Sequence, residues 1–150
     1  AALQRALLAA IHSGLVRSAH DTAEGGLAVA LVECAFAASE ARGMEVELAD
    51  EIGTAALLFG ETQSRVVVSC HPDDWERLAA MMAEHGVPAA RIGTVGAPGG
   101  QFRITTRAGV LDATVTELVD VYESAIPRRM DGSVGDIVTS LRAEVQNGQE

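Results

Sequence analysis

The chain has 150 residues, of which 48% are hydrophobic and 21% are charged, which is typical of a single globular domain with an ordinary core. Its formal net charge is −10, and all of its basic residues are arginines. An acidic balance argues against binding nucleic acid, whose affinity comes from neutralising phosphates, and against docking on anionic membranes. The absence of lysine excludes Schiff-base chemistry and a Walker A loop.

The first elements are a helix and a short extended segment. Leu3, Leu7 and Ile11 recur at helical spacing and share one face, and Gly14 is the expected end of the helix. Residues 15–20 then read as extended.

A second helix is predicted over residues 27–39, and it should be the most buried one. It is apolar around its whole circumference except at Glu33. The run is too short to span a bilayer, and nothing resembles a signal peptide, so we predict a cytoplasmic protein. Residues 44–48 alternate apolar and acidic side chains, which predicts a half-exposed strand, and residues 52–59 predict a short helix.

The middle of the chain predicts a strand followed by a helix. Residues 65–70 contain three consecutive valines, a pattern typical of a strand covered on both faces. Pro72 begins a helix that Gly86 ends. Its expected inward stripe is Trp75, Leu78, Met82 and His85.

The last third predicts a hairpin and then helices. Residues 92–95 and 102–105 form the predicted hairpin, and the helix that starts near Val115 should close at Pro127. This order predicts an α/β fold, a mixed sheet with helices on both faces. We expect one domain over residues 1–130 and a weakly helical C-terminal tail over 131–150.

Two short loops are the candidate ligand sites. In the first, Gly25 and Gly26 let the backbone approach a ligand, and the helix that follows presents unpaired N–H groups that suit a phosphate. Asp21, Thr22 and Glu24 line the same loop. The alternative is structural: Asp21 and Glu24 have the spacing of a capping box, which would satisfy those N–H groups internally.

The second loop leads into the triple-valine strand. Glu61, Thr62 and Gln63 offer a carboxylate, a hydroxyl and an amide, a set that can bind a polyhydroxylated or amide-bearing ligand. The alternative is a solvated turn.

Other candidates are weaker. Adjacent strand residues point to opposite faces, so the His20 and Asp21 side chains should diverge. Cys34 and Cys70 lack metal-ligand spacing and read as core thiols. The sequence therefore predicts two ligand loops, no catalytic residue and no metal site.

Taken together, the motifs resemble the second half of the large synthetase subunit of phosphoribosylformylglycinamidine synthase. The resemblance covers about residues 1–130 and departs from the family at Ala23, where serine is usual. The matching segments are Gly14 to Leu31, Leu58 to Arg65 with the valines that follow, Ile92 to Gly96, and Tyr122 to Pro127.

This resemblance implies an activity for a longer enzyme. That enzyme converts formylglycinamide ribonucleotide, glutamine-derived ammonia and ATP to the amidine with magnesium, in purine biosynthesis. The implied fold is three-layered and partly ferredoxin-like. The implied partners are the N-terminal domain of the same subunit, a glutaminase subunit and a small accessory subunit. The catalytic and magnesium-binding residues are then expected outside this chain, and residues 21–26 and 61–63 would border a substrate or phosphate pocket.

Two other readings remain open. The chain could be the corresponding domain of a related ATP-dependent enzyme, such as aminoimidazole ribonucleotide synthetase, thiamine-monophosphate kinase or selenophosphate synthetase. It could also be a sensing or assembly module without catalysis. If the chain is instead a domain of phosphoribosylformylglycinamidine synthase, Gly26→Asp should damage ligand capture in the full enzyme more than it damages the stability of this domain.

Overall fold

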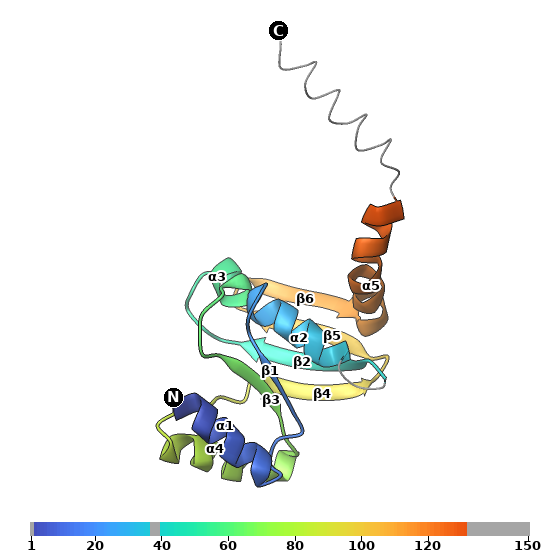
Figure 1. The fold of residues 1–150 in the computed structure, drawn as a ribbon. Coiled ribbons are helices and arrows are strands. Elements are labelled where there is room, and N and C mark those ends of the chain that lie inside the picture. Colours follow the sequence, from blue (N-terminus) through green and yellow to red (C-terminus); the bar gives the residue numbers. More distant parts are fainter. Residues whose placement is uncertain (1, 37–39, 132–150) are drawn as a thin grey trace. The chain divides into compact units, whose positions relative to one another are not determined.

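A computed structural model describes residues 2–36 and 40–131 of the chain (Figure 1). Two compact units divide it, residues 1–115 and 116–150, and each is described by itself. The first unit contains six strands in two sheets, together with helices. The predicted tail at 131–150 lies almost wholly outside the described residues, and the domain boundary at residue 130 stays a prediction. Within the described residues, no helix is both long and apolar enough to cross a membrane.

The first sheet has two strands. Strand β1 (Ser18–Asp21) pairs antiparallel with β3 (Val66–Ser69), so that His20 lies opposite Val67. The four residues of β3 are only partly buried, so the prediction that this strand is covered on both faces is wrong. Because the sheet ends at two strands, the valine run has only one neighbouring strand and does not lie inside a parallel sheet.

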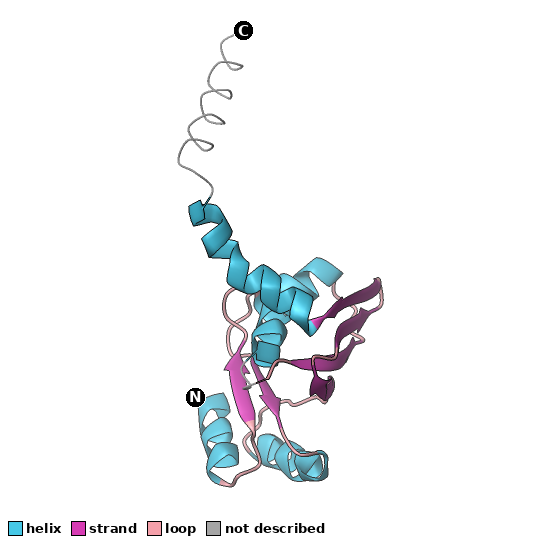
Figure 2. Ribbon diagram, turned by 90° about the vertical axis from the view of Figure 1, so that its right-hand side faces the viewer, coloured by secondary structure: helices cyan, strands magenta, loops and turns pink. Residues whose placement is uncertain are grey.

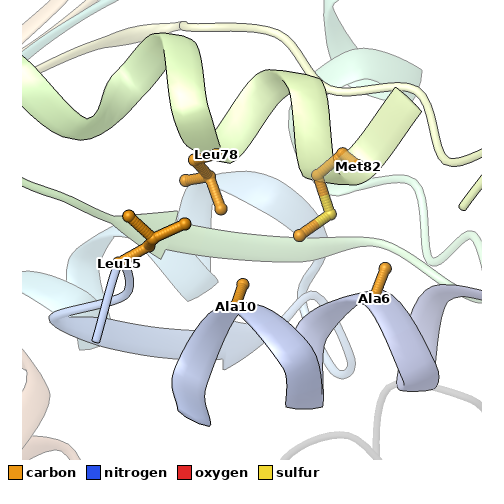
Figure 3. Packing of buried hydrophobic residues seen from close by; sticks show 5 residues of the cluster. All are labelled: Ala6, Ala10, Leu15, Leu78 and Met82. Atoms are coloured by element: carbon orange, nitrogen blue, oxygen red, sulfur yellow. The ribbon is translucent and has the colours of Figure 1, made fainter. Parts of the chain in front are cut away.

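Helices α1 (Ala2–His12) and α4 (Trp75–Glu84) lie side by side near this sheet (Figure 1). The short 3-10 turn η1 (Pro72–Asp74) leads into α4. Figure 3 shows side chains from α1, from α4 and from Leu15 pointing toward one another. They form the buried cluster of Ala6, Ala10, Leu15, Leu78 and Met82.

The inward faces of these two helices differ from the predicted stripes at their C-terminal ends. Ile11 and His85 are exposed, whereas the small side chains of Ala6 and Ala10 are fully buried. Alanine lets two helix backbones approach closely, so the contact forms where the side chains are small and not where the large ones recur.

The second sheet has four strands in the order β4-β2-β5-β6 (Figure 1), and Figure 2 shows the strands of both sheets in magenta. Its strands are β2 (Arg42–Leu48), β4 (Gly93–Pro98), β5 (Gln101–Thr106) and β6 (Gly109–Thr114). Strands β2 and β5 are parallel and the other pairs antiparallel, so the predicted mixed sheet and the α/β class are confirmed.

Burial alternates along β2 as predicted. Met44, Val46 and Leu48 are buried, and Glu45 and Glu47 are exposed. Phe102 and Ile104 of β5 lie opposite Met44 and Val46 and continue the buried face. On the polar face, Arg103 of β5 donates to Asp112 of β6 at 2.7 Å.

The predicted hairpin of β4 with β5 is wrong, because β2 lies between them and pairs with both. The hairpin that does form joins β5 to β6 across Arg107 and Ala108, and β6 was not predicted from the sequence. The prediction paired β5 with β4 because the two strands are close in sequence. In the structure β2 pairs with β5, and its buried residues between Met44 and Leu48 complete the apolar face of the sheet.

Two helices carry the candidate loops. Helix α2 (Gly26–Phe36) contacts β1 of the small sheet and β2 of the large one, and α3 (Thr54–Phe59) packs against α2. Six residues of α2 are buried, more than in any other described helix, as predicted. The site is therefore built on the most buried helix.

Helix α5 (Val115–Asp131) runs past Pro127, so the prediction that this proline closes the helix is wrong. Proline removes one backbone hydrogen bond, to the carbonyl four residues earlier. That carbonyl belongs to Glu123, an exposed residue, where water can replace the lost donor.

Candidate functional site

The first loop leaves β1 at Asp21 and enters α2 at Gly26. Gly25 and Gly26 both have positive φ, 77° and 70°, which side-chain-bearing residues rarely adopt. The loop closes on itself through a bond from the Gly26 N–H to the Ala23 carbonyl at 3.4 Å. The two glycines therefore make the sharp turn from strand to helix possible.

The second loop follows α3 and ends at the start of β3. Ser64 has φ of 65°, the only positive value among the described non-glycine residues. The Arg65 guanidinium donates to the Thr62 hydroxyl at 3.3 Å, which ties the middle of the loop to its end. Gln63 is exposed at the surface.

The structure brings the two loops together through their backbones and side chains. The Gly25 N–H donates to the Glu61 carboxylate at 3.0 Å. Thr22 donates to the Arg65 carbonyl twice, from its N–H at 3.1 Å and from its hydroxyl at 3.3 Å. The two loops therefore form one surface.

Gly26 brings the helix ends into direct contact. A Cβ placed on it would lie 2.7 Å from the carbonyl carbon of Phe59 and 2.8 Å from the carbonyl oxygen of Leu58. No side chain fits in this space. The start of α2 and the end of α3 are thus held at a distance that only glycine permits.

Apart from the two glycines, the predicted site residues divide into two groups. Thr22 is 6% exposed and its hydroxyl is engaged with Arg65, so this residue connects the loops. The exposed group, which a ligand could reach, is Asp21, Glu24, Glu61, Thr62 and Gln63.

The capping box considered for the first loop is not formed within the described residues. Neither Asp21 nor Glu24 accepts a hydrogen bond from the start of α2; the carboxylate that binds the loop is Glu61, far away in sequence. The Gly25 N–H is thus engaged by Glu61, which joins the second loop to the first.

The charge of this surface restricts what it can bind. Asp21, Glu24 and Glu61 are acidic and Arg65 is basic. A phosphate would be repelled by the three carboxylates unless a cation or further donors intervened. No cluster of three or more metal-ligating side chains occurs in the described part of the chain.

A further contact, which the sequence patterns did not indicate, supports the first loop. The His20 ring binds the Asp21 carbonyl through Nδ1 at 2.7 Å, and its Nε2 lies 3.2 Å from a carboxylate oxygen of Glu33. The sequence feature that could have indicated this contact is Glu33, the single charged residue in the otherwise apolar run of α2. Next to it, burial above all and the charge of Glu33 raise the pKa of the Cys34 thiol.

The fold and its paired loops define a known class of domain. The family model of the AIR synthase related protein C-terminal domain matches residues 1–105, which cover both loops and the strand pair that holds them. The chain belongs to this family. The family resemblance predicted from the motifs is confirmed.

Within the family, the chain is similar to phosphoribosylformylglycinamidine synthase subunits. It is 43% identical over 127 residues to the PurL subunit of Thermobifida fusca, covering 85% of this chain and 16% of that protein. It is 45% identical over 128 residues to PurL of Salinibacter ruber, covering 84% and 17%. The chain spans about a sixth of the length of the curated relatives it matches.

Solved structures share the fold. The Thermotoga maritima PurL complexed with ATP superposes with a TM-score of 0.69 at 22% identity, covering 78% of this chain and 21% of that one. The tt0281 protein of Thermus thermophilus superposes with a TM-score of 0.54 at 25% identity, covering 71% and 36%.

Proposed function

We propose that the chain is the C-terminal domain of the large synthetase subunit of phosphoribosylformylglycinamidine synthase. In the whole enzyme, ATP and ammonia from glutamine convert formylglycinamide ribonucleotide to the amidine, with magnesium. The observation that carries this proposal is the 43% identity to a PurL subunit over 85% of the chain. Solved PurL proteins complexed with ATP and with FGAR support the choice of ligands.

The two loops are proposed as one wall of a ligand site that another domain completes. Their exposed groups are carboxylates, a hydroxyl and an amide. Such a surface can orient a ligand but cannot activate an amide oxygen. The catalytic groups, the nucleotide and magnesium would then be held by an N-terminal domain of the same polypeptide.

The proposed partners are consistent with one solved assembly. The PurLQS complex of Thermotoga maritima contains a PurL chain with the fold described above. We propose that the enzyme containing this chain works with a glutaminase subunit, which supplies ammonia, and with a small accessory subunit.

The chain alone should show no turnover with ATP, ammonia and formylglycinamide ribonucleotide. A cleft between domains loses most of its contacts when one wall is missing, and affinity falls tenfold for about every 1.4 kcal/mol lost. Amidine formation can be followed by chromatography. Steady product release by the 150-residue chain would contradict the assignment of the catalytic groups to another domain.

Glu61→Ala, made in the complete synthetase polypeptide, should raise the KM for ATP or for the formyl substrate about tenfold. The substitution removes a charge-assisted hydrogen bond, a contact worth about 1.5–3 kcal/mol when formed, so the first loop is held to the second only by the Thr22 bonds to Arg65. Steady-state kinetics on the purified polypeptide measure the effect.

The matched control is Glu51→Ala. Glu51 is also an exposed glutamate with a single partner, Arg107 at 3.1 Å, but it lies outside both loops. It should leave both KM values within about twofold, because exposed ion pairs contribute about 1 kcal/mol or less. Equal KM values for wild type and Glu61→Ala would overturn the ligand role of the loops. If the wild-type synthetase polypeptide forms no amidine, the proposed function itself is wrong.

A further inference from the structure

Arg65 joins the two loops through both its backbone and its side chain. Its carbonyl oxygen accepts hydrogen bonds from the N–H and the hydroxyl of Thr22, at 3.1 and 3.3 Å. Its guanidinium donates to the hydroxyl of Thr62 at 3.3 Å. Ser64, which precedes it, has φ of 65°, so the chain turns sharply between Thr62 and Arg65. The carbonyl thus fixes the backbone of Arg65 to the first loop, and the guanidinium reaches back to the middle of the second.

The guanidinium restricts how the Thr62 hydroxyl can bond. A guanidinium has N–H donors and no acceptor, whereas a hydroxyl has one O–H donor and two lone pairs. The bond from Arg65 therefore uses a lone pair of Thr62, and the hydroxyl proton has to point away from the guanidinium. No second partner of this hydroxyl occurs among the described residues. Because Thr62 is exposed, its O–H donor remains for a ligand.

The charges of the joined loops restrict which ligand atom can accept that bond. Three carboxylates, on Asp21, Glu24 and Glu61, outnumber the one guanidinium. They repel a phosphate oxygen, but a neutral oxygen carries no net charge for them to repel. An amide carbonyl oxygen is neutral and can only accept. Formylglycinamide ribonucleotide, the substrate under the proposed function, carries oxygens of this kind.

We propose that Arg65 is a positioning residue, which holds the Thr62 hydroxyl as a hydrogen-bond donor to an amide oxygen of the formyl substrate. The inference rests on the proposed function and adds Arg65 to the residues of the ligand wall. Arg65 acts through Thr62 and does not touch the ligand. Without the guanidinium, the hydroxyl rotates freely about its Cβ–O bond and directs its proton to the ligand only part of the time.

The test uses steady-state kinetics on the complete synthetase polypeptide. Thr62→Val keeps the shape of the side chain and removes the hydroxyl, so the KM for formylglycinamide ribonucleotide should rise about tenfold with little change in kcat. Arg65→Met should raise the same KM about fivefold, because the hydroxyl remains but is no longer oriented. Thr62→Ser keeps the hydroxyl and should recover most of the affinity. The KM for ATP should stay within about twofold in all three variants.

The double variant Thr62→Val with Arg65→Met separates positioning from direct contact. If Arg65 acts through Thr62 alone, removing the guanidinium has no effect once the hydroxyl is gone, so the KM should rise about tenfold, as in Thr62→Val. Independent contacts would multiply the two effects to about fiftyfold, and that result would overturn the positioning role. The carbonyl that binds Thr22 is backbone and survives both substitutions. Melting temperatures should therefore match that of the wild type.

The matched control is Arg77→Met. Arg77 also donates from Nη1 to a side chain three residues earlier, that of Asp74 at 3.0 Å. This pair lies at the start of α4 and outside both loops. The substitution should leave both KM values within about twofold, because exposed ion pairs contribute little.

The outcomes separate this inference from the proposed function. If Glu61→Ala raises a KM and Thr62→Val raises none, the loops hold a ligand but Thr62 donates nothing to it, and the inference is wrong. A rise in the KM for ATP alone would also overturn it, because the acceptor would then belong to the nucleotide. If the wild-type polypeptide forms no amidine, the proposed function fails and the inference fails with it. A higher KM for the formyl substrate in Thr62→Val and Arg65→Met, restored in Thr62→Ser, would support the inference.

Discussion

Gly26→Ala should lower the free energy of unfolding of this chain by about 2–4 kcal/mol, because two separate costs combine at that position. The first is backbone strain, since φ is 70° and an L side chain is disfavoured there. The second is steric: the new methyl group would lie 2.7–2.8 Å from backbone atoms of Leu58 and Phe59. Backbone cannot rotate away as a side chain can, so α2 and α3 must separate.

Substitutions at two other glycines separate the cost of backbone strain from the cost of the steric clash. Gly14 has φ of 73° with nothing within 4 Å of a built Cβ, so Gly14→Ala should cost about 1 kcal/mol, the strain alone. Gly53 has φ of −56° and is equally open, so Gly53→Ala should change stability by less than about 0.5 kcal/mol. Urea denaturation of the three variants measures all three values. If Gly26→Ala costs no more than Gly14→Ala, the close contact of α2 with α3 is wrong.

The same packing corrects an expectation drawn from the sequence. Gly26→Asp was expected to impair ligand capture more than stability, but an aspartate meets the same backbone atoms as an alanine and must disturb the fold as well. Loss of ligand binding in that variant would therefore not distinguish a ligand role from a structural one. Glu61→Ala is the sharper probe, because Glu61 is exposed and only its side chain reaches Gly25.

Local patterns predicted the elements better than their partners. Alternation in residues 44–48 predicted the buried face of β2, and the apolar run after Gly26 predicted the buried helix. Pairing depends on which distant strand completes an apolar face, and this information is not local. The pairing of β4 with β5 was therefore predicted from the sequence, although each of these strands pairs with β2.

The candidate site shows the same division. Glycines and polar side chains marked both loops, because a tight turn beside a helix leaves a local signature. What joins them was not visible: Glu61 bonds to Gly25 across 36 positions, and Thr22 to Arg65 across 43. His20 was weighed only against its neighbour Asp21, whereas its charged partner, Glu33, lies on the next helix. Long-range hydrogen bonds need the fold before they can be assigned.

Leu78→Ala should lower the free energy of unfolding by about 3 kcal/mol, within the range of about 2–5 kcal/mol found for buried leucines. Leu78 is 1% exposed and packs among Ala6, Ala10, Leu15 and Met82 (Figure 3). Two of these neighbours are alanines, which have no side-chain torsion with which to fill a cavity. Met82 is flexible and can recover part of the lost contact, so the cost should stay below the upper limit.

Leu8→Ala is the control for this prediction, since it deletes the same atoms from the helix that faces α4. Leu8 is 54% exposed, so its loss should cost no more than about 0.5 kcal/mol. Urea midpoints measured at one pH, with unchanged denaturant slopes, compare the two variants directly. Equal costs would mean that α1 presents to α4 a face that includes Leu8, and not the face of Ala6 and Ala10. A large cost for Leu78 alone would agree with the close contact at Ala6 and Ala10, against which Val68 of β3 and the following Cys70 also pack.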